Sequence, residues 1–318
     1  MTKHLTHMLA LCLFGMLVLG CTQPEKYDCG TYSSAGVYKL SSDIESNADC
    51  IIINGSNIWI DCQGHSITYA KTSRGDGVDI GIAHDNITVR NCNIIDGKGS
   101  TYSHGIYLSA YSDGYNISHN NFNIDSSGSV GIWGEVASGI NGVVEYNNFT
   151  ITSGAPAEAI FYGFYMYGGT IAHNWINVIG AINGILFEDP GTALEIGRIW
   201  DNTIIAENAN CIYIHNAKAY NITLLNCTIR GTGSGIYNVL ETDEVRVYNS
   251  WFNIGSNGTA IHIQDGLVYM NNSVIVGDGA LFLSDGIDFY DLADSELFNT
   301  TFETGTVTIS QDEGLIIK

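Results

Sequence analysis

Apolar and polar positions alternate in short runs along this chain, and the runs recur about every two dozen residues. Each repeat opens with a small residue and an apolar-x-apolar phrase, as at Gly105–Leu108, and continues to a second apolar run ending in Asn, as at Ile117–Asn120. Alternation indicates half-buried strands, and a fixed period of this size indicates a solenoid. No stretch after residue 21 combines a helical period with capping signals. The pattern predicts an all-β, single-domain, right-handed parallel β-helix.

The recurring Asn (or Asp) gives the length of each coil. A corner Asn tolerates a left-handed backbone, and its side chain can hydrogen-bond the same amide one coil above. We expect about ten coils, which at ~4.8 Å each form a rod of roughly 50 Å. The series expected at this corner is Asn120, Asn147, Asn174, Asp201, Asn226, Asn249, Asn271 and Asn299.

The repeat divides the 318-residue chain into one elongated body and a short leader. Only three Pro residues occur, and no Pro-rich or Ser-rich linker interrupts the repeat. We expect the β-helix to span 51–318 and a cap over 27–50 to cover its open end, where edge strands would otherwise invite association.

The first residues indicate export. Lys3 precedes an apolar run that is too short to span a bilayer and that ends in Val18-Leu19-Gly20-Cys21, which resembles a lipobox. We therefore expect a lipoprotein signal over 1–20, lipidation of Cys21, and a tether over 21–26. The alternatives are a plain secretory signal with an incidental Cys, or a retained anchor. Either signal would place the mature chain outside the cell, and lipidation would hold it at the surface.

Six further cysteines form an even set, as is usual in an oxidising compartment. Cys29 and Cys50 bracket the cap, and we expect a disulfide between them. The state of the other four, Cys62, Cys92, Cys211 and Cys227, is left open. Neighbouring coils bring Cys62 and Cys92 within disulfide reach, and Cys211 and Cys227 could face each other across one coil. The alternative is that all four are buried as small apolar residues.

The chain is strongly acidic, with a formal net charge of −21 from 12 basic and 33 acidic residues. This composition argues against binding nucleic acid, because phosphate neutralisation needs a basic surface. It favours a soluble monomer, with calcium as an optional ligand. No calcium-loop or zinc-finger spacing occurs in the sequence, so we expect no metal site and no other cofactor.

Two segments carry a family resemblance: Cys29-Gly followed by Gly36-Val-Tyr-Lys-Leu, and Asn57-Ile-Trp-Ile-Asp-Cys-Gln-Gly-His-Ser-Ile67, with Asn-Ile-Thr and Asn-Cys-Thr-Ile units after them. With these the mature chain resembles right-handed β-helix proteins of the pectin-lyase-like superfamily, and most closely the exported envelope proteins of archaea and some bacteria. The resemblance implies the fold. It does not select an activity, because the superfamily includes lyases, hydrolases, epimerases and adhesins.

The same resemblance gives three catalytic candidates, Asp76, Asp79 and His104. Galacturonan hydrolases of this superfamily carry Asp-Gly-x-Asp and Gly-His-Gly motifs, which these residues echo, and hydrolysis needs two carboxyl groups flanking the bond. His104 stands where a second carboxylate pair is expected, and no Arg-x-Lys patch occurs. A lyase would need an Arg base such as Arg74 or Arg90 beside these acids. The structural alternative is that Asp-Gly and His-Gly are ordinary corner dipeptides.

A second set of candidates is predicted from the alternation itself. In each small-apolar-x-apolar phrase, the residue between the apolar pair should point outward, so successive coils build an aromatic stripe along one face. Aromatic rings on an exposed face are typical of glycan-binding and other interaction surfaces, while ring stacking for stability is the alternative. Reading up the rod, this outward position holds Asp79, Tyr107, Trp133, Phe161, Leu186, Tyr213, Tyr237, His262 and Phe282.

Three functions remain open from the sequence. The first is a lipid-anchored surface rod that binds polysaccharide or packs into the envelope without catalysis. The second is a lyase or glycoside hydrolase acting on acidic polysaccharide, and the third is an adhesin-like spacer that binds protein. The aromatic stripe favours the first.

Overall fold

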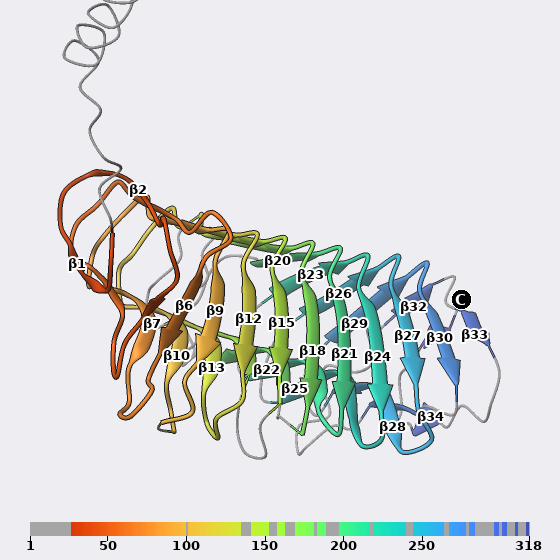
Figure 1. Ribbon diagram of the computed structural model, residues 1–318. Coiled ribbons are helices and arrows are strands. Elements are labelled where there is room, and N and C mark those ends of the chain that lie inside the picture. The colour runs from red at the N-terminus through yellow and green to blue at the C-terminus, as the bar shows by residue number, and fades with distance from the viewer. Residues whose placement is uncertain are drawn as a thin grey trace, which may run out of the picture.

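The protein is a rod wound from short parallel strands, with the N-terminal coils at one end and the C-terminal coils at the other (Figure 1). The computed structural model describes residues 27–99, 101–134, 141–152, 158–162, 169–180, 183–188, 197–215, 219–239, 244–263, 267–277, 280–283, 296–298, 301–303, 309–310 and 316–317. No helix in these ranges is long and apolar enough to cross a membrane. The leader over 1–20, Cys21 and the tether lie outside them.

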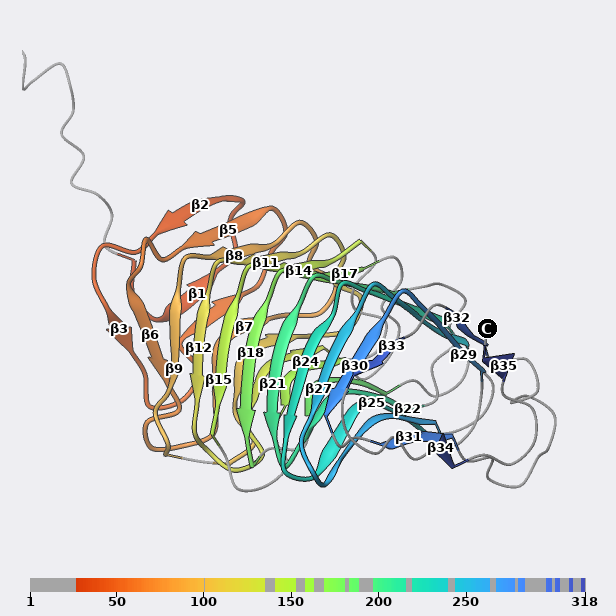
Figure 2. The same ribbon diagram turned by 90° about the vertical axis from the view of Figure 1, so that its right-hand side faces the viewer.

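Each coil contributes one strand to each of three sheets, which form the three faces of the rod (Figure 2). Sheet A has twelve strands: β1 (Gly30–Tyr32), β4 (Ile51–Ile53), β7 (Asp76–Ile80), β10 (His104–Leu108), β13 (Val130–Gly134), β16 (Glu158–Tyr162), β19 (Asn183–Glu188), β22 (Asn210–His215), β25 (Gly233–Val239), β28 (Gly258–Ile263), β31 (Ala280–Leu283) and β34 (Ile309–Ser310).

Sheet B follows sheet A in every coil and also has twelve strands. They are β2 (Gly36–Lys39), β5 (Ile58–Asp61), β8 (Thr88–Arg90), β11 (Asn116–Ser118), β14 (Val143–Glu145), β17 (Thr170–Ala172), β20 (Gly197–Trp200), β23 (Ala219–Thr223), β26 (Glu244–Tyr248), β29 (Leu267–Asn271), β32 (Glu296–Phe298) and β35 (Ile316–Ile317).

Sheet C completes the coil with eleven strands. They are β3 (Ile44–Glu45), β6 (Ser66–Tyr69), β9 (Asn93–Asp96), β12 (Asn121–Ile124), β15 (Asn148–Ile151), β18 (Trp175–Ile179), β21 (Thr203–Glu207), β24 (Asn226–Arg230), β27 (Trp251–Ile254), β30 (Val274–Gly277) and β33 (Thr301–Glu303). All three sheets are parallel throughout, which confirms the predicted β-helix, with slightly more coils than the ten expected.

The core consists of columns of similar side chains that repeat from coil to coil. In sheet C the rings of Phe122 and Phe149 stack with centroids 4.4 Å apart and planes 6° from parallel. Gly105 lies against this column: a Cβ there would come within 2.5 Å of the Gly131 carbonyl oxygen and 2.8 Å of the Phe122 ring. This close approach explains why a small residue opens the repeat. One column of sheet B, fully buried, contains Ile60, Val89, Ile117, Val144, Ile171, Ile199, Ile222 and Val247.

The segment 27–50 contributes the first strand of each of the three sheets. Its strands β1, β2 and β3 pair in register with β4, β5 and β6 of the second coil. The strand Ile44–Glu45 has only two residues, against four in β6 and β9, which is why the first clear repeat in the sequence begins at Ile51. Strand pairing thus continues across residue 50, and the role of 27–50 as a cap over the open end stays a prediction.

At the corner between sheets B and C, the left-handed backbone and the ladder of side-chain hydrogen bonds belong to two adjacent residues. We had expected one Asn to provide both. The first residue has a left-handed backbone, as at Tyr146 (φ 54°) and His173 (φ 54°). The second is buried, and here the amide ladder Asn120, Asn147, Asn174 and Asn202 runs up the rod. The expected series was correct up to Asn174 and wrong from Asp201 to Asn271, where Asp201 occupies the left-handed position and Asn202 the ladder; Asn299 lies outside the described residues.

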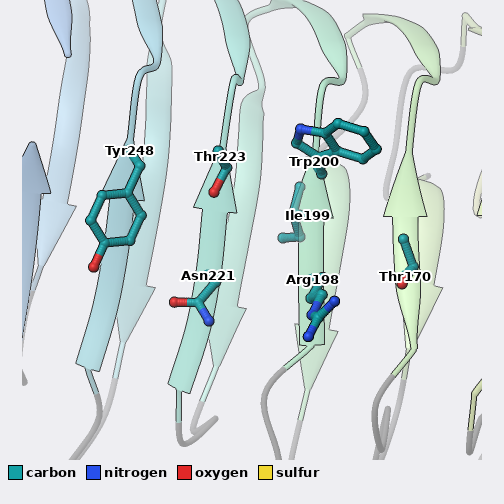
Figure 3. A pocket seen from close by; sticks show the side chains of 7 residues that line it. All are labelled: Thr170, Arg198, Ile199, Trp200, Asn221, Thr223 and Tyr248. Atoms are coloured by element: carbon teal, nitrogen blue, oxygen red, sulfur yellow. The ribbon is translucent and has the colours of Figure 1, made fainter. Parts of the chain in front are cut away.

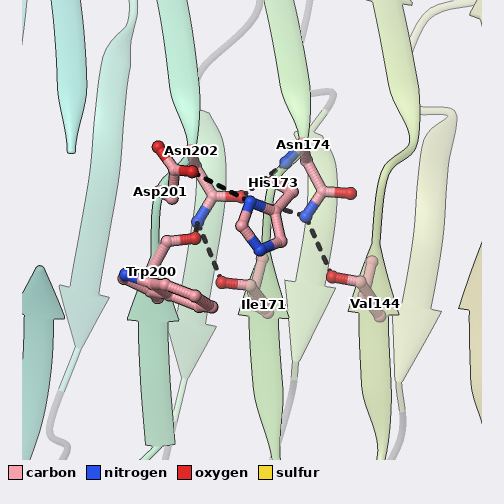
Figure 4. Close-up of polar contacts among 7 residues, drawn as sticks. All are labelled: Val144, Ile171, His173, Asn174, Trp200, Asp201 and Asn202. Atoms are coloured by element: carbon pink, nitrogen blue, oxygen red, sulfur yellow. Dashed lines mark hydrogen bonds and ion pairs between the residues drawn. The ribbon is translucent and has the colours of Figure 1, made fainter. Parts of the chain in front are cut away.

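The two inner amides of the ladder, Asn147 and Asn174, make the same bonds in successive coils. The Asn147 Oδ1 accepts from the main-chain N–H and the Nδ2 of Asn120, both at 3.0 Å, and its Nδ2 donates to the Ile117 carbonyl at 2.8 Å and to Asn174 Oδ1 at 3.1 Å. Figure 4 shows the same pattern one coil further, where Asn174 donates to the Val144 carbonyl and Asn202 to that of Ile171. Buried polar groups need such partners.

Three disulfides cross-link the rod. The expected Cys29–Cys50 bridge joins the first two coils, with the Cα atoms 4.4 Å apart. Cys62–Cys92 joins the second and third coils at the B–C corner. Cys211–Cys227 crosses from sheet A to sheet C within one coil. The two pairings that the sequence left open are therefore both formed. Three disulfides point to an oxidising, exported environment.

Candidate functional site

The residues of the aromatic stripe lie in one column on the outer side of sheet A. Strand pairing places Asp79 beside Tyr107, Tyr107 beside Trp133, and each later member beside the next, as far as His262 and Phe282. Alternation within each strand puts the flanking residues of the phrase inside, where Ile106 and Ile132 are fully buried. The strand register therefore turns a sequence repeat into a continuous line of side chains along the rod.

The rings of the stripe touch one another and still present surface. Tyr213 and Tyr237 have ring centroids 5.1 Å apart and tilted planes, and His262 lies 4.4 Å from Tyr237. Each of these three side chains is partly exposed, as are those of Tyr107 and Trp133. The side chains of Phe161 and Phe282 lie outside the described set. Mutual packing contributes about 0.5–1.5 kcal/mol per aromatic pair, so stacking for stability and exposure to a ligand coexist here.

The imidazole of His262 lies in the stripe between Tyr237 and Phe282 of the neighbouring coils. Burial among its neighbours lowers the pKa of His262 below the ordinary value of 6.5, because desolvation disfavours the charged imidazolium. The ring is therefore neutral at neutral pH and adds to the apolar character of the stripe.

Two of the catalytic candidates meet at the N-terminal end of the stripe. The Asp76 Oδ1 accepts a hydrogen bond from the main-chain N–H of His104 at 3.0 Å and lies 2.8 Å from His104 Nδ1. His104 is nearly buried, and its ring packs at about 5 Å from the rings of Tyr107 and Trp133. An Asp that holds Nδ1 fixes the orientation of the imidazole, as in sites that use the other nitrogen as a base.

The third candidate does not join that pair. Asp79 lies on the same strand as Asp76, and its neighbour in the next coil is Tyr107, so the two carboxylates come from one coil and not from adjacent coils. Arg90 lies on sheet B and pairs with Asp61 at 3.0 Å instead of approaching Asp76. Burial raises the pKa of Asp61, but hydrogen bonds from Asn91, the Gln63 N–H and Arg90 outweigh burial and hold it below the ordinary range.

A buried tyrosine lies near Asp76 and Asp96 inside the rod. Tyr69 is fully buried, and its pKa is raised well above the ordinary value by burial first and by the charges of Asp96 and Asp76 second. Its hydroxyl therefore stays protonated. Among the described residues, no group of three His, Cys, Asp or Glu side chains is placed to hold a metal ion. The described residues therefore give no set of ligands for the optional calcium ion.

The sequence reasoning missed a hollow of about 570 Å³ on the outer side of sheet B (Figure 3). It spans the four successive strands β17, β20, β23 and β26, and its signal in the sequence is an x-apolar-x phrase, as in Arg198-Ile-Trp200 and Asn221-Ile-Thr223. The phrase shows which residues point outward, but not how their sizes shape a hollow. The lining residues are Thr170, Arg198, Ile199, Trp200, Asn221, Thr223 and Tyr248.

A second line of rings, the corner stack, leads into that hollow along the B–C corner. His119 stacks on Tyr146 at 5.1 Å, Tyr146 on His173 at 4.5 Å, and His173 meets Trp200 edge-on at 4.6 Å. Asp201 holds the His173 Nδ1 at 2.9 Å (Figure 4). The first three of these rings sit on left-handed backbone, which directs their side chains outward in successive coils.

In comparisons with known proteins, the chain matches no protein-family model, no curated protein and no solved structure. The fold and its surfaces therefore carry the functional argument.

Proposed function

We propose that this protein is a lipid-anchored cell-surface rod that binds polysaccharide, or packs into the glycan of the envelope, without catalysis. The observation that supports the proposal is the in-register aromatic stripe of sheet A. The flat apolar face of a sugar ring packs on an aromatic face, while the hydroxyl groups at its rim stay in water or bond nearby polar groups. A line of rings that follows the rod axis suits a linear polymer better than a small molecule.

The rod is well matched to this task because its surface is set independently of its core. The inward columns and the amide ladder hold the coils in register, so an outward side chain in one coil has a fixed neighbour in the next. Rigid presentation lowers the entropy that binding would otherwise cost. A strongly acidic chain also remains soluble and monomeric while presenting apolar rings.

The surface location is part of the proposal. The lipobox at Val18–Cys21 supports an anchor, and the disulfides agree with export. Kinship with the exported envelope members of the pectin-lyase-like superfamily is proposed on the resemblance alone. Membrane fractionation tests the anchor: the wild-type protein should partition with membranes, and Cys21→Ser should release it. An unchanged distribution would contradict lipidation.

Glycan-array binding tests the function. The wild-type protein should bind one class of polysaccharide, and Tyr213→Ala should weaken that binding about tenfold, which corresponds to about 1.4 kcal/mol. Trp175→Ala is the matched control, because Trp175 is an exposed ring on sheet C, away from the stripe. Binding that is equally unaffected by both variants would rule out the stripe. Binding to proteins and to no glycan would favour the adhesin-like spacer.

The Asp76–His104 pair favours one alternative, a lyase or hydrolase acting on acidic polysaccharide, because an Asp-oriented His is a common general base. Reducing-end and unsaturated-uronate assays over acidic polysaccharides separate this alternative from binding alone. The proposal expects no turnover. Turnover that disappears in His104→Gln while the protein stays folded would establish the enzyme instead.

A further inference from the structure

The hollow on sheet B has a shape set by side-chain size. In one row, Thr223 lies between the large rings of Trp200 and Tyr248, each one coil away, and in the row beside it Asn221 follows Arg198 and Thr170 (Figure 3). Two coil steps separate the backbone positions that carry the two rings by about 9.6 Å along the sheet. That gap is wide enough for a ring-shaped ligand with van der Waals contacts of about 3.5–4.0 Å on both sides.

The chemistry of the lining indicates a polar ring with a negative group. Trp200, 44% exposed, and Tyr248 offer apolar faces, while Asn221, Thr223 and the Tyr248 hydroxyl can bond hydroxyl groups. Arg198 brings a cation, and its neighbours in the adjacent coils, Thr170 and Asn221, are uncharged. No ion pair joins Arg198 to a carboxylate within the described ranges. A guanidinium pairs best with a carboxylate or another oxyanion.

The corner stack extends the hollow along the rod. Its four rings occupy successive coils and end at Trp200, and Tyr146 is about half exposed. A ligand that reaches from the hollow toward Tyr146 would therefore be a chain and not a single ring. The nearby Asp201 is engaged with His173, which keeps this carboxylate directed at the corner.

We propose that this hollow is a second glycan site, separate from the aromatic stripe, which takes an anionic sugar unit of a linear polysaccharide. Arg198 binds the acidic group, Trp200 and Tyr248 contact the sugar faces, and the corner stack carries the adjoining units. The site lies on a different sheet from the stripe, so the protein holds glycan on two faces.

Calorimetric titration of the folded mature chain with β-1,4-linked tetraglucuronate tests this site, and cellotetraose is the neutral counterpart. All titrations use the Tyr213→Ala/Tyr237→Ala variant as background, which removes two rings of the stripe. Loss of binding at the stripe is then distinguished from loss of binding at the hollow. We expect this background to bind tetraglucuronate at least tenfold more tightly than cellotetraose. Adding Arg198→Gln should abolish that preference, and Arg198→Lys should retain part of it.

Arg230→Gln is the matched control, because Arg230 is an exposed arginine on sheet C, outside the hollow. Trp200→Ala should weaken both oligosaccharides, and circular dichroism confirms that each variant is folded. The proposal is overturned if the background binds no tetraglucuronate, if it binds the two probes equally, or if Arg198→Gln and Arg230→Gln have the same effect.

Discussion

Two columns of residues run along this rod, one inside the B–C corner and one outside sheet A, and their contents follow different rules. The inner column holds the amide ladder, and beyond it Ser250 and Ser273, whose hydroxyls accept the main-chain N–H of Leu225 and Ser250 at 3.1 and 3.2 Å. Before the ladder, the Cys62–Cys92 disulfide fills the same position. Amide, hydroxyl and disulfide thus join consecutive coils at one place.

The outer column has no such requirement to meet. The fold needs only a side chain that tolerates a strand there, and Asp79 shows that a carboxylate is sufficient. Yet the later members of the column are mostly rings. A residue in the inner column is therefore explained by the bonds it makes within the rod. The rings of the outer column exceed what the fold requires.

Removing the disulfide of the inner column should have the largest effect. Cys62→Ser/Cys92→Ser opens a loop of sequence separation 30, so we expect a loss of roughly 3–4 kcal/mol in the free energy of unfolding, measured by urea denaturation. Cys211→Ser/Cys227→Ser, with a separation of 16, should cost somewhat less. If Cys62→Ser/Cys92→Ser leaves the midpoint unchanged, the inner column does not hold the coils together.

Removing one amide of the ladder should cost nearly as much. Asn147→Ala removes the acceptor of the main-chain N–H and Nδ2 of Asn120 and one donor to the Ile117 carbonyl and to Asn174 Oδ1, and we expect a loss of about 3 kcal/mol. Asn148→Ala is the matched control, since the adjacent Asn is exposed. Equal losses for the two variants would contradict the assignment of the ladder.

A ring of the stripe should matter less for stability. Tyr237→Ala removes contacts with Tyr213 and His262, and we expect a loss of about 1 kcal/mol in the same urea experiment. A loss as large as that of Asn147→Ala would show that the fold requires the rings, and would remove the reason to assign them to a ligand.

The smallest effect concerns the pH dependence of stability. Because the pKa of His262 is lowered in the folded state, the unfolded chain takes up a proton first as the pH falls below 6.5, and stability is lost through that window. His262→Phe keeps a ring and removes the titration. The wild-type protein should therefore lose more stability than this variant between pH 7.5 and pH 5, with no such difference above pH 7.5. Parallel pH profiles would contradict the lowered pKa.

The sequence predicted the parts of this structure that depend on one strand at a time. Alternation at Gly105–Leu108 identifies the outward Tyr107, and equal spacing of the phrases gives its neighbour Trp133. The sequence could not separate the ladder residue from its left-handed neighbour, because the pair Asp201-Asn202 offers a short polar side chain at either position. The hollow was missed because it depends on the relative sizes of side chains in four coils that only folding brings together.

Hydroxyl-radical footprinting with and without saturating glycan tests the role of the stripe most directly. The account predicts that oxidation of Trp133, Tyr213 and Tyr237 falls when the glycan is bound, while the exposed rings Trp175 and Trp251 of sheet C react as before. Protection of the sheet C rings with unchanged oxidation of the stripe would contradict it.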